Sequence, residues 1–243
     1  MQAKLLFQCD NLKLPIHYNN IVQGFIYKNI SDDSFREFLH EKGFEYEKRT
    51  FKLFTFSDLM GRYDFNKQDK TITFKNEVSL VIGSIVDDFT NDFINSCLKS
   101  NDLRLKGQKI KLKGVEIDND NIENESIVVK TLSPVVTYST VNIEGSKKTI
   151  YYSPNDTLFS KQIKRNLIKK AEAIGYNDYK DRFNIYPLDE KKMRKRITKY
   201  KGLIINGWNG LLKIEGDKTL IKIALSCGIG AKNSQGFGCI TVL

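Results

Sequence analysis

The sequence is poor in the residues that build metal sites and disulfide frameworks. Its 243 residues include four cysteines and two histidines, and no two cysteines form a C-x-x-C pair. Zinc sites and small disulfide-linked folds depend on such clusters. We therefore expect no metal, no cofactor and a reducing, cytoplasmic setting.

Long apolar segments are also missing. No stretch approaches the roughly 18 consecutive apolar residues that a membrane-spanning helix requires. Residues 1–10 contain one short apolar run and lack the apolar core of a secretory signal. We expect no association with a membrane.

Positive charge and aromatic residues are plentiful by contrast. The chain has 39 Lys and Arg against 29 Asp and Glu, so its formal net charge is +10. Such an excess favours a polyanionic partner, because each phosphate that a cationic side chain contacts releases condensed counterions. A hydrophobic fraction of 40%, with 15 Phe and 11 Tyr, is sufficient for an ordinary globular core.

The chain divides near its middle. Residues 118–125 are acidic and rich in amides, which is typical of a linker or long loop. We predict an N-terminal domain over residues 1–118 and a C-terminal domain over residues 126–243. Both halves show strands and two main helices in the order of a βαββαβ unit, so the predicted fold is α+β with tandem ferredoxin-like (RRM-like) domains.

Apolar periodicity and capping residues place the individual elements. In the first half the pattern predicts strands over 4–9, 52–57, 78–83 and 109–117, and helices over 18–30, over 34–41 and after 87–88. In the second half it predicts strands over 127–130, 135–139, 182–187, 194–200, 203–214 and 237–243, and helices that begin after Asp156 and Asp217.

The most distinctive segment is a glycine-rich loop near the C-terminus, over residues 228–238. It does not match the dinucleotide-binding fingerprint, because Asn233 occupies the third glycine position and the loop leads from a helix into a strand. Such a loop can bring backbone N–H groups close to a phosphate. It can equally be a tight connection whose glycines adopt positive φ. The residues that would bind RNA here are Gly228, Gly230, Lys232, Asn233, Ser234, Gln235 and Gly236.

This loop resembles the signature of the RAMP superfamily. Together with the strand sequence KLFTFS at 52–57, it is similar to the CRISPR repeat-processing endoribonucleases, the Cas-six family. Segments 15–27, 38–40 and 131–134 agree with that family in the same order. The resemblance spans nearly the whole chain and implies tandem ferredoxin-like domains.

The resemblance also implies an active site. One branch of the family uses a Tyr, a His and a Lys, and these roles carry onto Tyr27, His40 and Lys52. RNA supplies its own nucleophile, the ribose 2′-OH, so cleavage needs an acid–base group and positive charge near the phosphorane. His40 can serve as acid or base, Lys52 can stabilise the phosphorane, and Tyr27 can position the 2′-OH. Each residue also has a structural interpretation on its own helix or strand.

A basic stretch over residues 191–201 is the second candidate surface for RNA. Strand-like alternation would place Arg194 and Arg196 on one face with Tyr200 nearby, which suits stacking and phosphate contact. The residues we expect to bind RNA there are Lys192, Arg194, Lys195, Arg196 and Lys199. The helix after Asp156 carries a further cationic group, for which a solvated face is the alternative.

We therefore expect a metal-independent endoribonuclease that cleaves CRISPR precursor RNA within its repeats and leaves 5′-OH and 2′,3′-cyclic phosphate ends. The main alternative is a non-catalytic RAMP subunit that binds guide RNA in an effector complex. A weaker one is a general single-strand RNA-binding module. The expected partners are precursor and mature guide RNA, and the resemblance allows a multisubunit effector complex and a homodimer.

Overall fold

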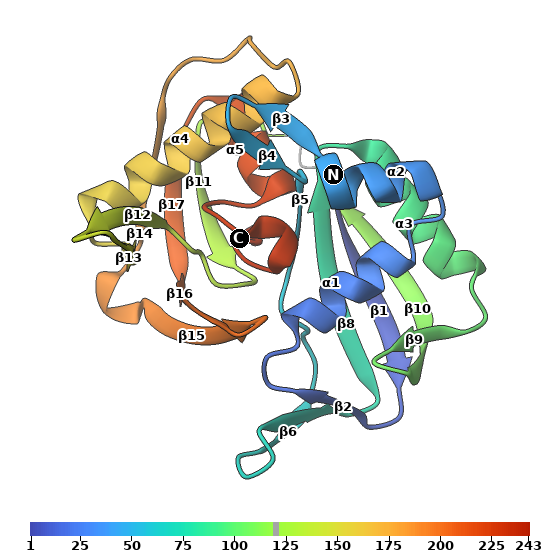
Figure 1. Cartoon of the computed structure of the whole chain (residues 1–243). Coiled ribbons are helices and arrows are strands. Elements are labelled where there is room, and N and C mark those ends of the chain that lie inside the picture. Colours follow the sequence, from blue (N-terminus) through green and yellow to red (C-terminus); the bar gives the residue numbers. More distant parts are fainter. Residues whose placement is uncertain (119–121) are drawn as a thin grey trace.

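The computed structural model describes residues 1–118 and 122–243. Its elements form two groups, each built on an antiparallel sheet (Figure 1). The first group comprises β1 (Gln2–Cys9), β2 (Leu12–Pro15), α1 (Asn19–Lys28), α2 (Asp33–Glu37), β3 (Phe44–Tyr46), β4 (Arg49–Phe51), β5 (Phe54–Phe56), β6 (Tyr63–Asn66), β7 (Thr71–Phe74), β8 (Glu77–Ser84), α3 (Asp87–Lys99), β9 (Leu103–Leu105) and β10 (Gln108–Asp118).

The main sheet of the first group has the ferredoxin-like strand order. Its five strands run β5-β8-β1-β10-β9, so without β9 the second, third, first and fourth strands of a βαββαβ unit lie side by side. The apolar sides of α1 and α3 pack on this sheet through buried residues such as Phe25 and Phe93. β2, β6 and β7 form a separate small sheet.

The second group repeats this plan. It comprises β11 (Ser126–Thr131), β12 (Tyr138–Ile143), β13 (Ser146–Tyr151), α4 (Thr157–Ala173), β14 (Phe183–Pro187), β15 (Arg194–Tyr200), β16 (Leu203–Asn209), β17 (Leu211–Gly216), α5 (Lys218–Cys227) and β18 (Ile240–Val242). The order β14-β17-β11-β18 is again that of a ferredoxin-like unit, with α4 and α5 packed on the sheet. The hairpins β12–β13 and β15–β16 extend from it. The tandem ferredoxin-like fold is therefore confirmed.

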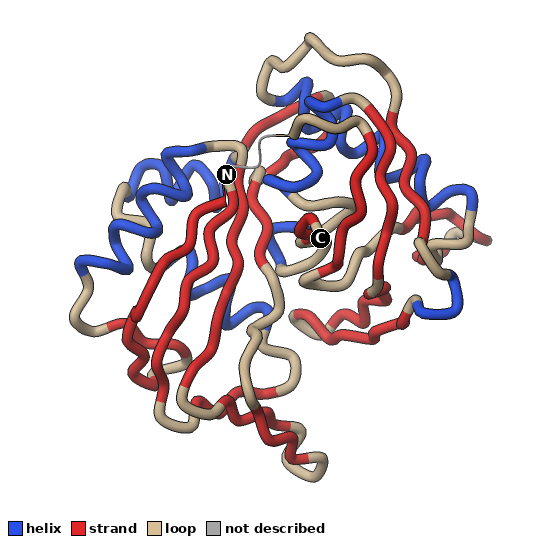
Figure 2. The backbone as a smooth tube through the Cα atoms, turned by 180° about the vertical axis from the view of Figure 1, so that it is seen from behind, coloured by secondary structure: helices blue, strands red, loops and turns tan. Residues whose placement is uncertain are grey.

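Both groups have a helix layer and a sheet layer. Figure 1 shows the helices of the two groups, and Figure 2, seen from behind, shows their strands. The glycine loop and β18, in red in Figure 1, lie between the groups. Gln2 Nε2 donates hydrogen bonds to Leu225 O at 2.7 Å and to Ile240 O at 2.8 Å, so the first strand is tied directly to the last one.

Several expected elements are confirmed with their capping residues. Asp32 Oδ1 accepts a hydrogen bond from Phe35 N at 2.9 Å at the start of α2. Asp217 caps α5 by accepting from Thr219 N at 2.9 Å. None of the helices in the described ranges is both long and apolar enough to span a bilayer.

Other expectations are wrong in detail. The predicted strand over 135–139 makes only isolated bridges at Val135 and Val136, and β12 starts at Tyr138. The predicted strand over 203–214 is two strands broken at Gly210, where the Met193 side chain packs against the backbone.

The predicted strand over 52–57 shortens to Phe54–Phe56, because Leu53 has a φ of +53° that interrupts pairing. The last strand is Ile240–Val242 rather than 237–243. The predicted helix over 34–41 ends at Glu37 and continues as a wider turn to Lys42. Of the predicted linker 118–125, residues 119–121 lie outside the described residues.

Candidate active site

The fold brings Tyr27, His40 and Lys52 together from three separate segments. Tyr27 lies on α1, His40 lies in the turn after α2, and Lys52 lies between β4 and β5. The Tyr27 and His40 rings meet edge to face, with their centroids 5.7 Å apart. Lys52 Nζ donates a hydrogen bond to the His40 carbonyl oxygen at 3.0 Å. A hydroxyl, an imidazole and an ammonium group are thus gathered at one place.

His40 is presented to solvent by a wide helical turn. The turn spans Phe38–Lys42 and closes with a hydrogen bond from Gly43 N to Phe38 O at 2.7 Å. Gly43 has a φ of +74°, and a Cβ there would lie 2.6 Å from Phe51 O, so this position requires glycine. The His40 side chain is 68% exposed, which leaves it free to meet a macromolecular substrate.

The neighbouring Glu41 favours the tautomer of His40 in which Nδ1 carries the proton. His40 Nδ1 lies 2.6 Å from Glu41 Oε1. An ionised carboxylate only accepts hydrogen bonds, so Nδ1 of the neutral imidazole is the protonated nitrogen. Nε2 then keeps its lone pair and can act as a general base.

The other two groups are partly buried. Burial, followed by the nearby Tyr200, raises the pKa of Tyr27 to about 12, so its hydroxyl keeps its proton near neutral pH and can donate a hydrogen bond. Burial lowers the pKa of Lys52, while the Glu41 carboxylate opposes that change. The cluster therefore offers one base, one hydroxyl donor and one cationic group.

The glycine loop at 228–238 is packed between the two groups. Gly228 and Gly236 are buried, and a Cβ on them would lie 2.7 Å from Thr55 Oγ1 and 2.5 Å from Phe56 respectively, both on β5. A Cβ on Gly230 would lie 2.4 Å from Val136 O. The glycines thus allow the loop to approach protein backbone and side chains closely.

Buried polar side chains hold the loop from inside. Asn233 Nδ2 donates to Ile229 O and to Phe237 O, both at 3.0 Å. Lys170 on α4, which is 2% exposed, donates from Nζ to Asn233 Oδ1 at 2.8 Å and to Gly228 O at 2.7 Å. Burial lowers the pKa of Lys170 to about 8.

Helix α1 holds the same loop from the other side. Asn19 Nδ2 donates to Gly236 O at 3.0 Å, and Gln23 Nε2 donates to Ser234 O at 2.7 Å. RNA binding by the loop residues stays a prediction, because the contacts in the structure are with protein. Lys232, Ser234 and Gln235 keep partly exposed side chains, whereas Gly228, Gly230, Asn233 and Gly236 are enclosed.

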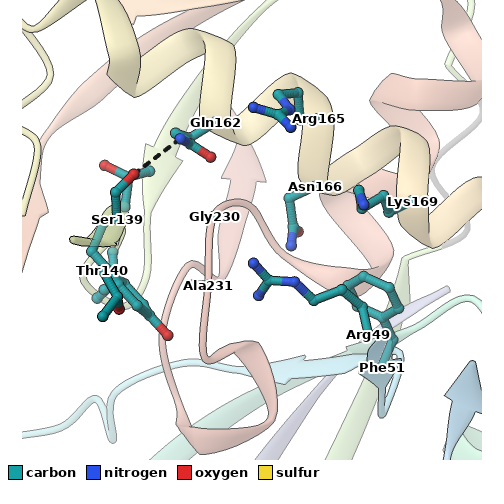
Figure 3. A pocket seen from close by; sticks show the side chains of 13 residues that line it. Arg49, Phe51, Ser139, Thr140, Gln162, Arg165, Asn166, Lys169, Gly230 and Ala231 are labelled. Carbon is teal, nitrogen blue, oxygen red and sulfur yellow. Dashed lines mark hydrogen bonds between the residues drawn. The ribbon is translucent and has the colours of Figure 1, made fainter. Parts of the chain in front are cut away.

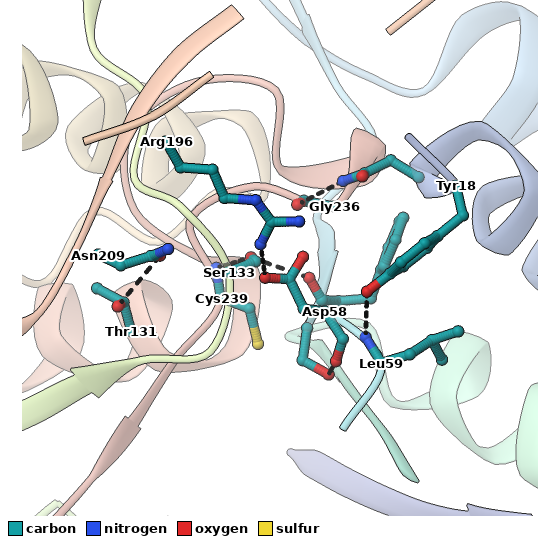
Figure 4. Close-up of polar contacts among 12 residues, drawn as sticks. Tyr18, Asp58, Leu59, Thr131, Ser133, Arg196, Asn209, Gly236 and Cys239 are labelled. Carbon is teal, nitrogen blue, oxygen red and sulfur yellow. Dashed lines mark hydrogen bonds and ion pairs between the residues drawn. The ribbon is translucent and has the colours of Figure 1, made fainter. Parts of the chain in front are cut away.

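One face of the basic strand β15, which carries Arg196, Thr198 and Tyr200, points toward the protein interior. Thr198 and Tyr200 are 2% and 6% exposed, and Arg196 forms an ion pair with Asp58 from the first group (Figure 4). Tyr200 donates a hydrogen bond to Gln23 on α1. The face on which we expected Arg196 and Tyr200 to contact RNA therefore lies largely inside the protein, because alternation along a strand defines two faces but not which one is buried. RNA binding by Arg196 stays a prediction.

The opposite face of β15 is exposed. Lys195 and Lys199 point away from the body, with Ile197 between them 61% exposed. Lys195 Nζ lies 5.9 Å from the centroid of the Trp208 ring on β16. Arg194 and Lys192 are exposed as well, and Arg194 donates from its guanidinium to the carbonyl of Lys191 at 2.7 Å. Their RNA-binding role stays a prediction.

Sequence reasoning missed the groups that orient His40 and that hold β15 against the first group. Glu41 was not selected, although its position beside His40 is a visible signal. Asp58 and Gln23 could not be found from sequence, because their partners on β15 lie 138 and 177 residues further along the chain. Within the described parts of the chain, no group of three His, Cys, Asp or Glu side chains is placed to hold a metal ion.

Comparison with known families covers residues 13–242 of the chain. The family model described as CRISPR associated protein Cas6, C-terminal, matches residues 116–242. The model described as CRISPR-associated protein Cas6, N-terminal, matches residues 13–116. The two matches meet at residue 116, close to the end of β10.

Individual relatives agree with these matches. CRISPR-associated endoribonuclease Cas6 1 of Methanocaldococcus jannaschii is 29% identical over 246 residues, which cover 99% of this chain and 92% of the relative. CRISPR-associated endoribonuclease Cas6 of Pyrococcus furiosus is 25% identical, with 95% of this chain and 84% of the relative covered.

Solved structures give the same result. One titled "CRISPR associated protein Cas6" superposes with a TM-score of 0.79 at 28% identity, over 100% of this chain and 99% of that one. One titled "An RAMP protein binding different RNA substrates" has a TM-score of 0.82 at 20% identity over 100% and 99% of the two chains, and it supports the shared fold.

Proposed function

The chain belongs to the Cas6 family of CRISPR-associated proteins, and from this premise we propose that it is an endoribonuclease that cuts CRISPR precursor RNA within its repeats. Relatives over nearly the full length carry the name endoribonuclease. The observation that carries the proposal is the meeting of Tyr27, His40 and Lys52 at an exposed position. We propose that the catalytic groups belong to an N-terminal domain, 1–118, and that a C-terminal domain, 126–243, contributes to RNA binding.

The proposed reaction uses the ribose 2′-OH next to the scissile phosphate. His40 Nε2 takes the 2′-OH proton as the oxygen attacks phosphorus. Breaking the bond to the 5′-oxygen then releases an alkoxide, and the imidazolium of His40 returns the proton to it. The products are a 5′-OH and a 2′,3′-cyclic phosphate, and no water is consumed.

Lys52 and Tyr27 support this transfer in different ways. The Lys52 ammonium group lies beside His40 and stabilises the charge that develops on the phosphorane oxygens. The Tyr27 hydroxyl, which remains protonated, donates a hydrogen bond that positions the reacting ribose or phosphate. Because neither role requires a metal ion, we propose that cleavage is metal-independent.

A substrate that lacks one hydroxyl tests this mechanism. Repeat RNA with a single 2′-deoxy nucleotide immediately 5′ of the scissile phosphate should bind normally and resist cutting. EDTA should leave cleavage of unmodified RNA unchanged, and analysis of the ends should find a cyclic phosphate. Cutting of the deoxy substrate at the same bond, together with loss of activity in EDTA, would identify metal-activated water as the nucleophile.

The alternative of a non-catalytic RAMP subunit makes a different prediction in the same assay. Such a protein would bind both RNAs with similar affinity and cut neither. The exposed His40 with an orienting carboxylate favours the enzyme, because binding alone does not require that arrangement.

A further inference from the structure

A basic pocket lies beside the proposed catalytic cluster, and the mechanism proposed above does not use it. It has a volume of about 410 Å³ and is enclosed by β4, β12, α4 and the glycine loop (Figure 3). The two groups both contribute, because Arg49 and Phe51 come from β4 and the remaining lining residues from the second group. Its volume is within the range of small-ligand sites, roughly 300–1,000 Å³.

Every charged residue that lines the pocket is cationic. Arg49, Arg165 and Lys169 line it, and none of the thirteen lining residues is acidic. Lys169 pairs with Glu47. Across the described ranges, neither Arg49 nor Arg165 has a carboxylate within 4.0 Å. Two guanidinium groups that share a pocket and lack acidic partners are suited to a phosphate, which their planar donors can bind in a bidentate manner.

The remaining lining groups suit a nucleoside. The rings of Phe51 and Tyr138 offer apolar surface on which a base can stack. Asn166 points its amide from α4 into the pocket, with Oδ1 buried and Nδ2 turned toward the open space (Figure 3). That donor can meet an acceptor on a base edge. Positive charge, aromatic surface and one directed amide together describe a nucleotide site.

The position of the pocket relates it to cleavage. Arg49 lies three residues before Lys52, so their Cα atoms are separated by at most about 11 Å. Phe51 lines the pocket, and the next residue belongs to the catalytic cluster. A phosphate on Arg49 and the scissile phosphate near Lys52 therefore fit near-neighbouring nucleotides of one strand.

We propose that this pocket binds one unpaired nucleotide of the RNA close to the scissile bond, with its phosphate on Arg49 and Arg165 and its base against Phe51 and Asn166. The proposal rests on the proposed function for the identity of the RNA. It makes the junction of the two groups a specificity-determining site, because a base-paired nucleotide could not enter such a pocket.

A charge-removal scan tests the proposal. Repeat RNA carrying the protective 2′-deoxy nucleotide is prepared with one uncharged methylphosphonate linkage at each position in turn. Affinity is measured for the wild type, for Arg49→Ala/Arg165→Ala, and for the control Arg62→Ala/Arg104→Ala, which removes the same charge from exposed positions elsewhere. We expect one linkage near the scissile bond at which neutralisation weakens wild-type binding roughly ten- to a hundredfold.

The pocket variant should be insensitive at that one linkage, while the control variant keeps the full effect. If every linkage has the same effect in the pocket variant as in the wild type, the proposal is overturned. A second outcome also overturns it. A free nucleoside monophosphate would quench Tyr or Trp fluorescence of the wild type but not of Arg49→Ala/Arg165→Ala, while no RNA linkage would differ in its effect between these two proteins. Because these measurements need no cleavage, failure of the wild type to cut RNA would refute the proposed function separately.

Discussion

The proposed catalytic cluster and the glycine loop both match the family, but their side chains are used in opposite ways. His40 is 68% exposed, and a single carboxylate orients its ring. In the loop, Asn233 is enclosed and makes hydrogen bonds to two backbone carbonyls and to the buried Lys170. The first region exposes its proposed acid–base group, and the second uses distinctive residues to join two sheets.

A distinctive sequence motif can therefore have an architectural role in the fold. The sequence allowed two roles for the loop glycines: binding a phosphate or forming a tight connection. In the structure these glycines lie close to β5 and Val136. The proposed catalytic groups, in contrast, come from residues with ordinary sequence surroundings. Substitutions in the two regions should therefore separate activity from stability.

The largest effect should come from His40→Ala. Loss of the acid–base group should slow single-turnover cleavage by roughly 10²–10⁴-fold. RNA affinity and the thermal unfolding midpoint should stay near wild type, because the side chain is exposed. His17→Ala removes the other histidine and serves as the matched control. A normal cleavage rate in the His40 variant would refute the catalytic assignment and break the contrast between the regions.

In the loop, Gly238→Ala should reduce the stability of the protein. Gly238 has a φ of +73°, and a Cβ there would lie 2.0 Å from Ile229 O. The variant should lose about 2–4 kcal/mol of unfolding free energy through strain and overpacking. Chemical denaturation measures this loss.

Gly107→Ala provides the control for backbone conformation alone. Gly107 has a nearly identical φ of +75°, with no atom within 4 Å of the added Cβ. It should lose only about 1 kcal/mol. Equal losses in the two variants would show that the close packing of the loop contributes nothing to stability.

The buried Lys170 should make the stability of the loop region depend on pH. Burial lowers its pKa to about 8 from an ordinary 10.5, so between these values the unfolded chain binds more protons than the folded one. Stability from this group therefore rises with pH across that window, by at most about 1.4 kcal/mol per pH unit.

Denaturation of wild type and Lys170→Met at several pH values between 7.5 and 10.5 isolates this contribution. The difference in unfolding free energy between the two proteins should grow with pH in favour of the wild type. If the difference in unfolding free energy does not change with pH, Lys170 stays protonated in the folded protein over this range. The three carbonyl oxygens that accept hydrogen bonds from its ammonium group would then be the reason.

The smallest expected effects come from comparing substitutions on the two faces of β15. Arg196→Ala leaves Asp58 without its ion-pair partner and should cost about 1–2 kcal/mol, because the pair is partly exposed. Lys195→Ala/Lys199→Ala should leave stability unchanged and should reduce the log–log salt slope of RNA binding by about 0.7 for each phosphate that the variant no longer neutralises.

Lys109→Ala/Lys111→Ala removes equal charge from exposed positions on another strand, β10, and is the control for general electrostatics. If it lowers the salt slope as much as the β15 pair, the outward face of β15 has no special contact with RNA. If Arg196→Ala changes the slope while stability is retained, the inward face contacts RNA after all.

Sequence patterns were sufficient to predict the elements whose structure depends on local periodicity. The apolar spacing of α3 and the cap of α5 are visible in sequence because both reflect contacts within a few residues. The β6–β7 hairpin was missed although Tyr63–Asn66 and Thr71–Phe74 both alternate apolar and polar residues, because each strand is only four residues long. The orientation of β15 depends on Asp58, a partner that becomes adjacent only in the folded chain.

The candidate site follows the same rule. The resemblance selected Tyr27, His40 and Lys52, and the fold brings them into contact. The pocket at Arg49 and Arg165 could not be predicted, since residues more than a hundred positions apart line it together. A local motif indicates which residues are unusual, and the topology decides what they touch.

The ties between the chain's first and last strands affect how the protein matures during synthesis. Gln2 contacts Ile240, and Asn19 and Gln23 on the helix that carries Tyr27 hold residues 234–236. A ribosome makes residues 234–236 more than two hundred positions after α1, so the helix lacks these supports until then. Contacts between residues so distant in sequence also form slowly. A nascent chain should therefore be unable to cut RNA until translation of this region ends, which separates synthesis of the protein from its activity in time.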